Sequence, residues 1–267
     1  MPWSERVLVR DGMRLVARDF GGPGTPVVLL HGLAGSAGEW EQSAAQLSPR
    51  YRVVALDQRG HGASERRPSD LSRAAFVADV VALIEQLGLD RPILVGQSLG
   101  GHTAMLTAAA HSVLLRALVL VEAGAGGPNP PSVAAGIAAW LESWPVPFAT
   151  LHAAEEFFTA QQMPAAWASG LQERDGQWWP CFEPDVMVEC LAENATHSWW
   201  SEWARIECPT LLVLGEHGII PAADLDQMLR LRPETTATTI PATGHDLHLE
   251  QPEALHAALT DFLDHLA

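Results

Sequence analysis

The sequence predicts an α/β fold: a mostly parallel, twisted sheet with helices on both faces and a helical segment inserted late in the chain. Three observations predict it. Short apolar runs alternate with segments whose apolar residues recur at helical spacing, as in βα units. These runs are apolar throughout, which is typical of strands buried on both faces. The alternation stops once, between about residues 124 and 203, where most of the tryptophans lie.

The first element is expected to be a hairpin, because the residues on either side of Asp11-Gly12 alternate between polar and apolar. Buried strands are predicted over residues 27–30, 52–56, 93–96, 117–121, 210–214 and 236–240. A helix that stops at Gly88 is predicted from apolar residues three and four apart, namely Phe76, Val80, Leu83, Ile84 and Leu87. Further helices are expected over about residues 100–111 and from Pro252 onward.

The interrupted stretch predicts a cap. Residues 124–203, called the cap segment below, hold several prolines and eight of the ten tryptophans: Trp140, Trp144, Trp167, Trp178, Trp179, Trp199, Trp200 and Trp203. We expect it to cover the carboxyl edge of the sheet, where ligands bind in open α/β sheets, with residues 1–123 and 204–267 forming the core. Trp140, Trp144 and Trp167 are the expected pocket residues. The alternative is that these tryptophans only pack a small second core.

Composition excludes several classes of function. The formal net charge is −16 and all sixteen basic residues are arginines, which disfavours nucleic-acid and membrane-surface partners. Without lysine, no Schiff-base mechanism is possible. No run approaches the ~18 apolar residues of a membrane span, and the N-terminal stretch lacks the apolar region of a secretory signal. Three cysteines without ligand spacing are expected to be free thiols in the cytoplasm. No metal site or cofactor is expected, and the oligomeric state is not indicated.

Gly96-Gln97-Ser98-Leu99-Gly100 fits the pattern G-x-S-x-G. It follows a predicted strand and precedes a predicted helix, which is the setting of a nucleophile elbow. There the glycines leave room for a tight turn that projects the serine hydroxyl above the sheet, and the helix N-terminus favours developing negative charge. The pattern therefore predicts a nucleophilic serine.

Four motifs occur in one order along nearly the whole chain: His31-Gly32, residues 57–64 (DQRGHGAS), residues 96–100 and Gly244-His245. In these motifs the chain resembles the α/β-hydrolase fold superfamily, in its capped esterase-like branch. The resemblance implies that Ser98 is the nucleophile and His245 the general base. It also implies that the backbone N–H groups of Leu33 and Leu99 form the oxyanion hole. Asp57 and His61 are expected to shape a loop, and His248 to be a surface or packing residue.

The catalytic acid is missing from its usual position. In the family it follows the strand 210–214 by a few residues, and Gly218 stands there. Glu216 is close by, but at the wrong step of the turn. Glu122 ends the strand 117–121, and certain dehalogenases and lipases of this fold place the acid at that strand. Three alternatives stay open: Glu122, which is favoured, Glu216, or no acid at all.

The expected function is that of a serine hydrolase which cleaves an ester or lactone of an apolar or aromatic small molecule through an acyl-enzyme on Ser98. A serine nucleophile disfavours haloalkane dehalogenase and epoxide hydrolase chemistry, for which the family uses aspartate. Two alternatives stay open. One is a catalytically weak or non-hydrolytic protein of this fold, which binds a ligand or catalyses a cyclisation. The other is a C–C bond hydrolase or perhydrolase.

Overall fold

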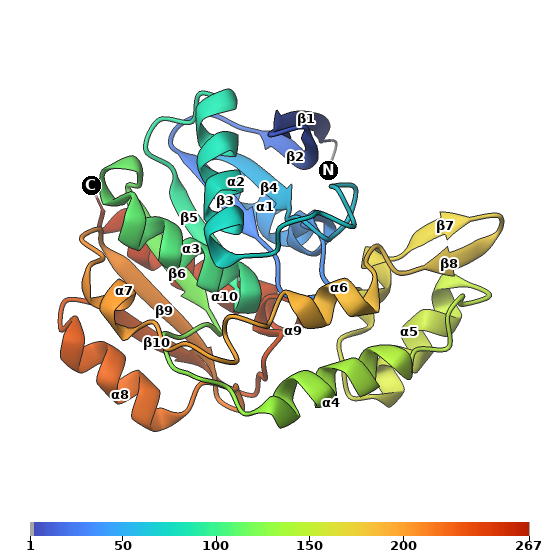
Figure 1. Ribbon diagram of the computed structural model, residues 1–267. Helices are drawn as coiled ribbons and strands as arrows, with labels where there is room; N and C mark the ends of the chain where they lie inside the picture. Colours follow the sequence, from blue (N-terminus) through green and yellow to red (C-terminus); the bar gives the residue numbers. More distant parts are fainter. Residues whose placement is uncertain (1–2, 267) are drawn as a thin grey trace.

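The computed structural model describes residues 3–266, and within these residues a sheet of eight strands forms the centre of the molecule (Figure 1). The spatial order is β1-β2-β4-β3-β5-β6-β9-β10, and all strands from β4 to β10 in this order run parallel. The strands span Ser4–Arg10 (β1), Met13–Gly21 (β2), Pro26–Leu30 (β3), Arg52–Asp57 (β4), Ile93–Gln97 (β5), Ala117–Val121 (β6), Thr210–Gly215 (β9) and Thr236–Ile240 (β10). The predicted N-terminal hairpin and the six predicted parallel strands are confirmed.

The strand order places a ligand site at one edge of the sheet. Strand β3 lies between β4 and β5, so the direction of winding reverses there, and ligands of open α/β sheets bind at the carboxyl ends beside such a reversal. The register pairs Leu30 with Gly96, and Gln97 with Val121. The residues that directly follow β3, β5 and β6 therefore lie side by side along this edge.

Helices cover both faces of the sheet, as the sequence predicts. One face packs against α2 (Arg73–Gln86), α3 (Ser98–Ala110), α7 (Trp200–Ala204) and α8 (Ala222–Leu231), with the short 3₁₀ helix η2 (Ser112–Leu114). The opposite face packs against η1 (Ala37–Trp40), α1 (Glu41–Leu47), α9 (Leu247–Glu250) and α10 (Pro252–Asp264). The sequence pattern does not predict α1 or α8 individually. Helix α3 starts two residues before the predicted position, because Ser98 itself is its first residue.

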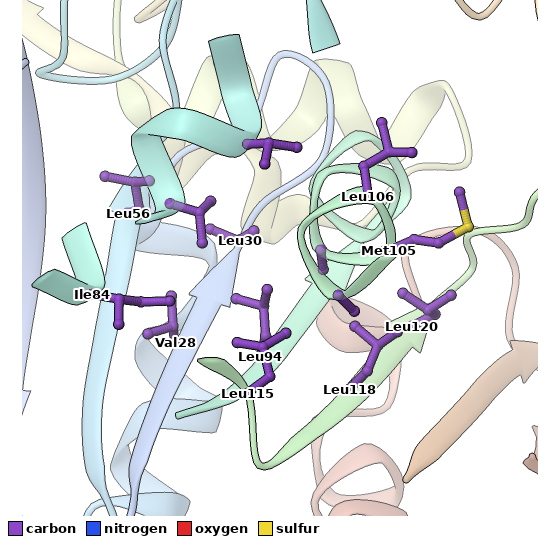
Figure 2. Packing of buried hydrophobic residues seen from close by; sticks show 14 of the residues in the cluster. Val28, Leu30, Leu56, Ile84, Leu94, Met105, Leu106, Leu115, Leu118 and Leu120 are labelled. Carbon is purple, nitrogen blue, oxygen red and sulfur yellow. The ribbon is translucent and has the colours of Figure 1, made fainter. Parts of the chain in front are cut away.

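The core on the first face is aliphatic. Figure 2 shows side chains from β3, β4, β5 and β6 pointing toward α2 and α3, among them Leu30, Leu94 and Leu120 opposite Ile84 and Met105. The three strand residues are fully buried, and burying one such side chain stabilises a fold by about 1.5–3 kcal/mol. This packing fixes the carboxyl ends of β5 and β6, on which the candidate site is built.

Most of the cap segment folds as a lobe along the carboxyl edge of the sheet (Figure 1). Its elements are α4 (Pro131–Glu142), α5 (Leu151–Ala160), η3 (Ala165–Gly170), α6 (Pro184–Glu189) and the hairpin of β7 (Gln172–Arg174) and β8 (Gln177–Trp179). Two backbone hydrogen bonds close its neck, from Trp199 N to Ala125 O and from Asn129 N to Asn194 O.

Seven of the eight tryptophans of the cap segment, all but Trp179, divide into two groups. Trp140, Trp144, Trp167 and Trp178 belong to an aromatic cluster within the lobe, which packs on Leu99 and Phe76 of the core. Trp199, Trp200 and Trp203 instead pack against the aliphatic core beside α3, and Trp203 is completely buried there. The chain therefore returns from the lobe to the core before residue 204.

Candidate active site

Ser98 lies at a sharp turn between β5 and α3. Its φ is +49°, a left-handed backbone conformation that residues other than glycine rarely adopt. The turn is possible because the residues two positions before and after Ser98 are glycines. A Cβ on Gly96 would collide with the backbone of Gly100, and a Cβ on Gly100 would collide with the carbonyl oxygens of Leu30 and His31. This geometry places the serine at the start of α3 and at the carboxyl edge of the sheet.

The loop after β3 passes directly over this turn. A Cβ on Gly32 would collide with Oε1 of Gln97, so any other residue at position 32 would displace the Gln97 side chain. His31 holds the loop to the next strand, because its Nε2 accepts from Gln58 N at 3.0 Å and its carbonyl oxygen accepts from Gln58 Nε2 at 2.7 Å. Leu33 and Leu99, whose N–H groups the resemblance assigns to an oxyanion hole, both line the cavity described below.

A buried polar network connects this loop with the turn. Thr103 Oγ1 donates to Gln58 Oε1 at 2.9 Å, and Arg73 Nη2 donates to Leu99 O at 3.2 Å. The side chains of Gln58, Thr103 and Arg73 thus form one polar network that contacts the carbonyl groups of His31 and Leu99. Asp57 has the structural position expected of it: it accepts from Ala37 N at 2.7 Å and from Ala63 N at 2.9 Å. Its carboxylate orders loops and is not among the residues that line the cavity.

Glu122 follows β6 and is almost completely buried, with 1% of its surface exposed. One carboxylate oxygen, Oε1, accepts from Gly215 N and the other, Oε2, accepts from Ile219 N, both at 2.7 Å. Oε2 also lies 3.6 Å from Nδ1 of His245. Two backbone donors therefore fix the carboxylate beside the imidazole.

Gly218 is a glycine because Glu122 occupies the space above it. A Cβ built on Gly218 would overlap the carboxylate carbon and both carboxylate oxygens of Glu122. A side chain at position 218, where the family has its catalytic acid, therefore has no room while the carboxylate of Glu122 lies there. Glu216, the second alternative, is exposed, and its Oε2 accepts from Ala242 N at 2.8 Å. It is not among the residues that line the cavity.

His245 lies in the loop between β10 and α9, with 31% of its side chain exposed. Gly244 N donates to Glu250 Oε2 at 2.7 Å and His217 N donates to Thr243 O at 2.9 Å, which fixes the loop on both sides. Gln97 Nε2 donates to the carbonyl of His245 at 3.0 Å and lies 3.3 Å from its Nε2. The imidazole thus has the Gln97 amide at Nε2 and the Glu122 carboxylate 3.6 Å from Nδ1, which has no hydrogen-bond partner.

Ser98, His245 and Glu122 line one cavity of about 650 Å³ under the cap segment. Trp140, Met163 and Trp167 of the cap segment face it, and Trp167 Nε1 donates to Asp246 Oδ2 at 2.9 Å. A larger hollow, of about 770 Å³, lies over α2 and α3 but is lined by none of the three side chains. We therefore place the candidate site in the smaller cavity, which all three side chains line.

Trp144 is a correction to the predicted pocket. It is 5% exposed and is not a lining residue; it lies behind the wall, with edge-to-face contacts to Trp140, Trp167 and Phe158. Trp140 lies in the last turn of α4, whereas Trp144 lies two residues beyond the end of that helix, so helical spacing does not place both in the cavity wall. Trp144 thus packs the lobe that holds Trp140 and Trp167 in place.

The cavity is also lined by polar residues that the sequence motifs do not assign to it, among them Glu39, Gln97, His102, Asn194 and Asp246. Position along the chain could have found three of them. Gln97 precedes Ser98, Asp246 follows His245, and His102 lies one helical turn after Ser98 on the same side of α3. Glu39 and Asn194 have no such signal, because η1 and the neck of the lobe reach the cavity only through the tertiary fold.

Several titratable groups near the site are fully buried. Burial lowers the pKa of His31 to about 4, that of His61 to about 3 and that of His248 to about 4. His248, expected at the surface or in packing, packs on the ring of Trp40. Burial also raises the pKa of Glu39 well above its ordinary range, and Asp246 adds to that shift.

The free energy of unfolding is expected to fall as the pH drops from about 6.5 to 4. His31, His61 and His248 stay neutral in the folded chain over this range but become protonated in the unfolded chain, so each lowers stability by up to about 1.4 kcal/mol per pH unit. Glu39 opposes them, because its raised pKa makes the folded chain take up a proton first. Urea denaturation at pH 8, 6 and 5 measures the net loss.

The matched variants are His248→Gln, which is expected to flatten this dependence, and His152→Gln, which replaces an exposed histidine and should leave it unchanged. An unfolding free energy that stays constant between pH 8 and 5 would contradict the buried, neutral state of these imidazoles.

Within residues 3–266, no three His, Cys, Asp or Glu side chains lie together as metal ligands, and no helix is long and apolar enough to cross a membrane. The three cysteines, Cys181, Cys190 and Cys208, are free thiols.

Solved structures and characterised proteins share this architecture. The crystal structure of E-2-(acetamidomethylene)succinate hydrolase superposes with a TM-score of 0.87 and 27% identity, covering 98% of this chain and 100% of that one. N-formylmaleamate deformylase of Pseudomonas putida is 28% identical over 96% of this chain and 94% of its own length. The sn-1-specific diacylglycerol lipase ABHD11 of Mus musculus is 29% identical over 89% of this chain and 80% of its own length.

A family model, described as the alpha/beta hydrolase family, matches residues 27–258. That range includes β3 to β10, Ser98, Glu122 and His245, and thus most of the core together with the whole cap segment. The relatives named above are all hydrolases by name. The chain therefore belongs to the alpha/beta hydrolase family and is related to enzymes that act as hydrolases.

Proposed function

We propose that this protein is a serine hydrolase that cleaves an ester or lactone of an apolar or aromatic small molecule through an acyl-enzyme on Ser98. One observation carries the proposal: the carboxylate of Glu122 fills the space above Gly218 and lies 3.6 Å from Nδ1 of His245. A carboxylate beside the imidazole and a serine on a strained turn in the same cavity form the constellation that activates a hydroxyl nucleophile.

His245 would act as general base and Glu122 as the group that orients it. An Nε2 that accepts from Gln97 leaves the ring proton on Nδ1, where it faces Glu122. This is the tautomer that a base needs, because Nε2 then carries the lone pair, and the Ser98 hydroxyl has to replace the Gln97 amide there before its proton is transferred. The 3.6 Å separation is longer than a hydrogen bond, and such contacts often shorten when substrate binds.

The reaction proceeds in two halves. Ser98 Oγ attacks the carbonyl carbon while His245 takes its proton, and the negative oxygen is stabilised by the N–H groups of Leu33 and Leu99. The tetrahedral adduct collapses, the C–O bond of the ester breaks, and His245 gives the proton to the departing alcohol. Water then attacks the acyl-enzyme, with His245 again as base, and releases the acid and free Ser98. For a lactone, alcohol and acid remain one molecule.

The cavity supports a substrate of moderate size with an apolar part. Trp140, Trp167 and Met163 supply an apolar wall, and 650 Å³ lies within the range of small-molecule sites. An apolar acyl or alcohol part would pack there and exclude water from the ester. The free thiols of the chain fit the cytoplasm as its location.

Hydrolysis of an N-acyl bond is the second candidate. N-formylmaleamate deformylase and E-2-(acetamidomethylene)succinate hydrolase are named for substrates in which an acyl group sits on nitrogen. The same residues could perform it, with His245 protonating a nitrogen leaving group. The main support for a non-catalytic role is the missing acid at Gly218. Since the Glu122 carboxylate occupies the space of a side chain there, this role is less favoured than the sequence alone suggests.

Hydrolysis of p-nitrophenyl butyrate and of the matched p-nitroanilide tests the proposal. The ester is expected to be turned over at a rate that saturates with concentration, and the anilide more slowly. Protein carrying Ser98→Ala from the same preparation is the background control. Turnover of the anilide alone would move the proposal to N-acyl bonds. Saturable binding of the ester without turnover would favour the ligand-binding alternative.

A further inference from the structure

The charged residues of the cavity are all acidic. Among the described residues that line it, the ionisable carboxyl groups are those of Glu39, Glu122, Asp224 and Asp246, and none is an arginine. The chain has no lysine. A carboxylate on a ligand would therefore meet like charge and find no cation to pair with, which is costly in a partly enclosed cavity.

One part of the cavity also holds polar atoms without partners. His102 is 6% exposed, lines the cavity, and both of its ring nitrogens are buried without a hydrogen-bond partner. Asn194, in the neck of the lobe, lines the cavity too, and its Oδ1 is likewise buried and unpaired. Buried polar groups normally have partners, and groups without one are often completed by a ligand or water.

These two residues belong to one region. His102 stacks edge-on against Trp199, whose backbone N–H donates to Ala125 O at the base of the neck. The backbone carbonyl of Asn194 accepts from Asn129 N in the same neck. Asp224 of α8 borders this region, because its carboxylate packs so closely on Gly126 that a Cβ there would overlap it. Asp224 is half-buried, and within residues 3–266 its carboxylate has no hydrogen-bond or ion-pair partner.

The unpaired atoms of this region are mostly acceptors. Burial and the neighbouring Arg73 guanidinium hold the pKa of His102 well below its usual range, so the imidazole is neutral and offers one donor and one acceptor. Asn194 Oδ1 and both oxygens of Asp224 can only accept. The complementary ligand group is one that carries N–H or O–H donors.

We infer that His102, Asn194 and Asp224 form a subsite that binds a hydroxyl or ammonium group of the substrate and rejects a carboxylate. The inference rests on the proposed function, since it names the substrate class of the same cavity. It separates this protein from the two relatives named for a maleamate and a succinate, which are carboxylated compounds. A substrate with an apolar part at Trp140 and Trp167 and a donor group at the subsite would use both kinds of lining in this cavity.

Four matched esters test the subsite: p-nitrophenyl hexanoates whose far end is methyl, hydroxyl, ammonium or carboxylate. At pH 7, kcat/KM for the hydroxyl and ammonium esters is expected to exceed that for the carboxylate ester by about tenfold or more. Asp224→Asn is expected to reduce the ratio of ammonium to carboxylate about tenfold. Asp226→Asn, an exposed position on the same helix with the same change of charge, should leave it unchanged.

His102→Leu supplies a readout that a purely structural role would not give. Removal of an unpaired buried imidazole is expected to raise the melting temperature, while the ratio of hydroxyl to methyl ester in kcat/KM falls. Equal effects of Asp224→Asn and Asp226→Asn, or a carboxylate ester that is hydrolysed as well as the ammonium ester, would overturn the subsite.

Failure of the subsite and failure of the proposed function give different results. If no ester is hydrolysed, the proposed function fails, and calorimetric titration with hexylamine and with hexanoate compares an ammonium with a carboxylate without turnover. Tighter binding of the amine, lost in Asp224→Asn, supports the subsite. Equal binding of the two compounds overturns it.

Discussion

Glu122→Gln is expected to lower kcat by about 10³–10⁴-fold, the effect seen when the acid of a Ser-His-Asp triad becomes an amide. The variant keeps the size of the side chain and one oxygen that can accept from Gly215 N or Ile219 N. It removes the negative charge beside Nδ1 of His245, so the imidazole is neither oriented nor stabilised when it becomes protonated. Steady-state hydrolysis of p-nitrophenyl butyrate measures the loss.

Glu216→Gln is the matched control. It makes the same change two residues from Gly218, at a carboxylate that accepts from Ala242 N and does not line the cavity. Its kcat should equal that of the unmodified chain. A strong effect of Glu216→Gln together with a weak effect of Glu122→Gln would exchange their roles. Melting temperatures of both variants separate a catalytic loss from a folding defect.

Moving the acid to the usual position of the family should have a similarly large effect. Gly218→Asp alone is expected to lower kcat on the order of 10³-fold, because its Cβ overlaps the Glu122 carboxylate and displaces it from its two backbone donors. Glu122→Gly combined with Gly218→Asp frees that space, and glycine also suits the φ of +47° at position 122. The combined variant is expected to regain about tenfold or more over Gly218→Asp, as coupled residues in contact do.

Glu122→Gly with Gly218→Asn controls for shape, because it has nearly the same volume at position 218 without the charge. It should stay as inactive as Gly218→Asp. If Gly218→Asp is as active as the unmodified chain, the carboxylate of Glu122 is not needed where the structure places it.

Most of the fold follows from local sequence patterns. Continuous apolar runs predict the parallel strands, and glycines in 96–100 predict the turn at Ser98, since both depend on residues that are neighbours in the chain. The short helices α1 and α8 are not predicted, because their stability comes from packing on the sheet more than from an apolar pattern of their own. The end of the cap segment is misplaced for a related reason: a tryptophan such as Trp203 can pack in either lobe, and only the tertiary structure decides.

The candidate site is predictable where a motif carries it and not where distant segments meet. Sequence alone leaves three alternatives for the acid, because the distance from a carboxylate to His245 depends on how β6, β9 and β10 pair. A Cβ at position 218 would overlap Glu122, which lies ninety-six positions away in the sequence. No local sequence pattern predicts this contact. Trp144 and Asn194 show the same limit, since burial and cavity lining depend on the packing of the lobe on the core.

The most direct test of the central claim, an activated Ser98 supported by Glu122, is intact-mass analysis after exposure to a fluorophosphonate, with peptide mapping of the adduct. We expect a single adduct, on Ser98, that forms far more slowly in Glu122→Gln than in the unmodified chain or in Glu216→Gln. No adduct on Ser98, under conditions that label a control serine hydrolase, would contradict the account and favour a protein of this family that binds its ligand without covalent catalysis.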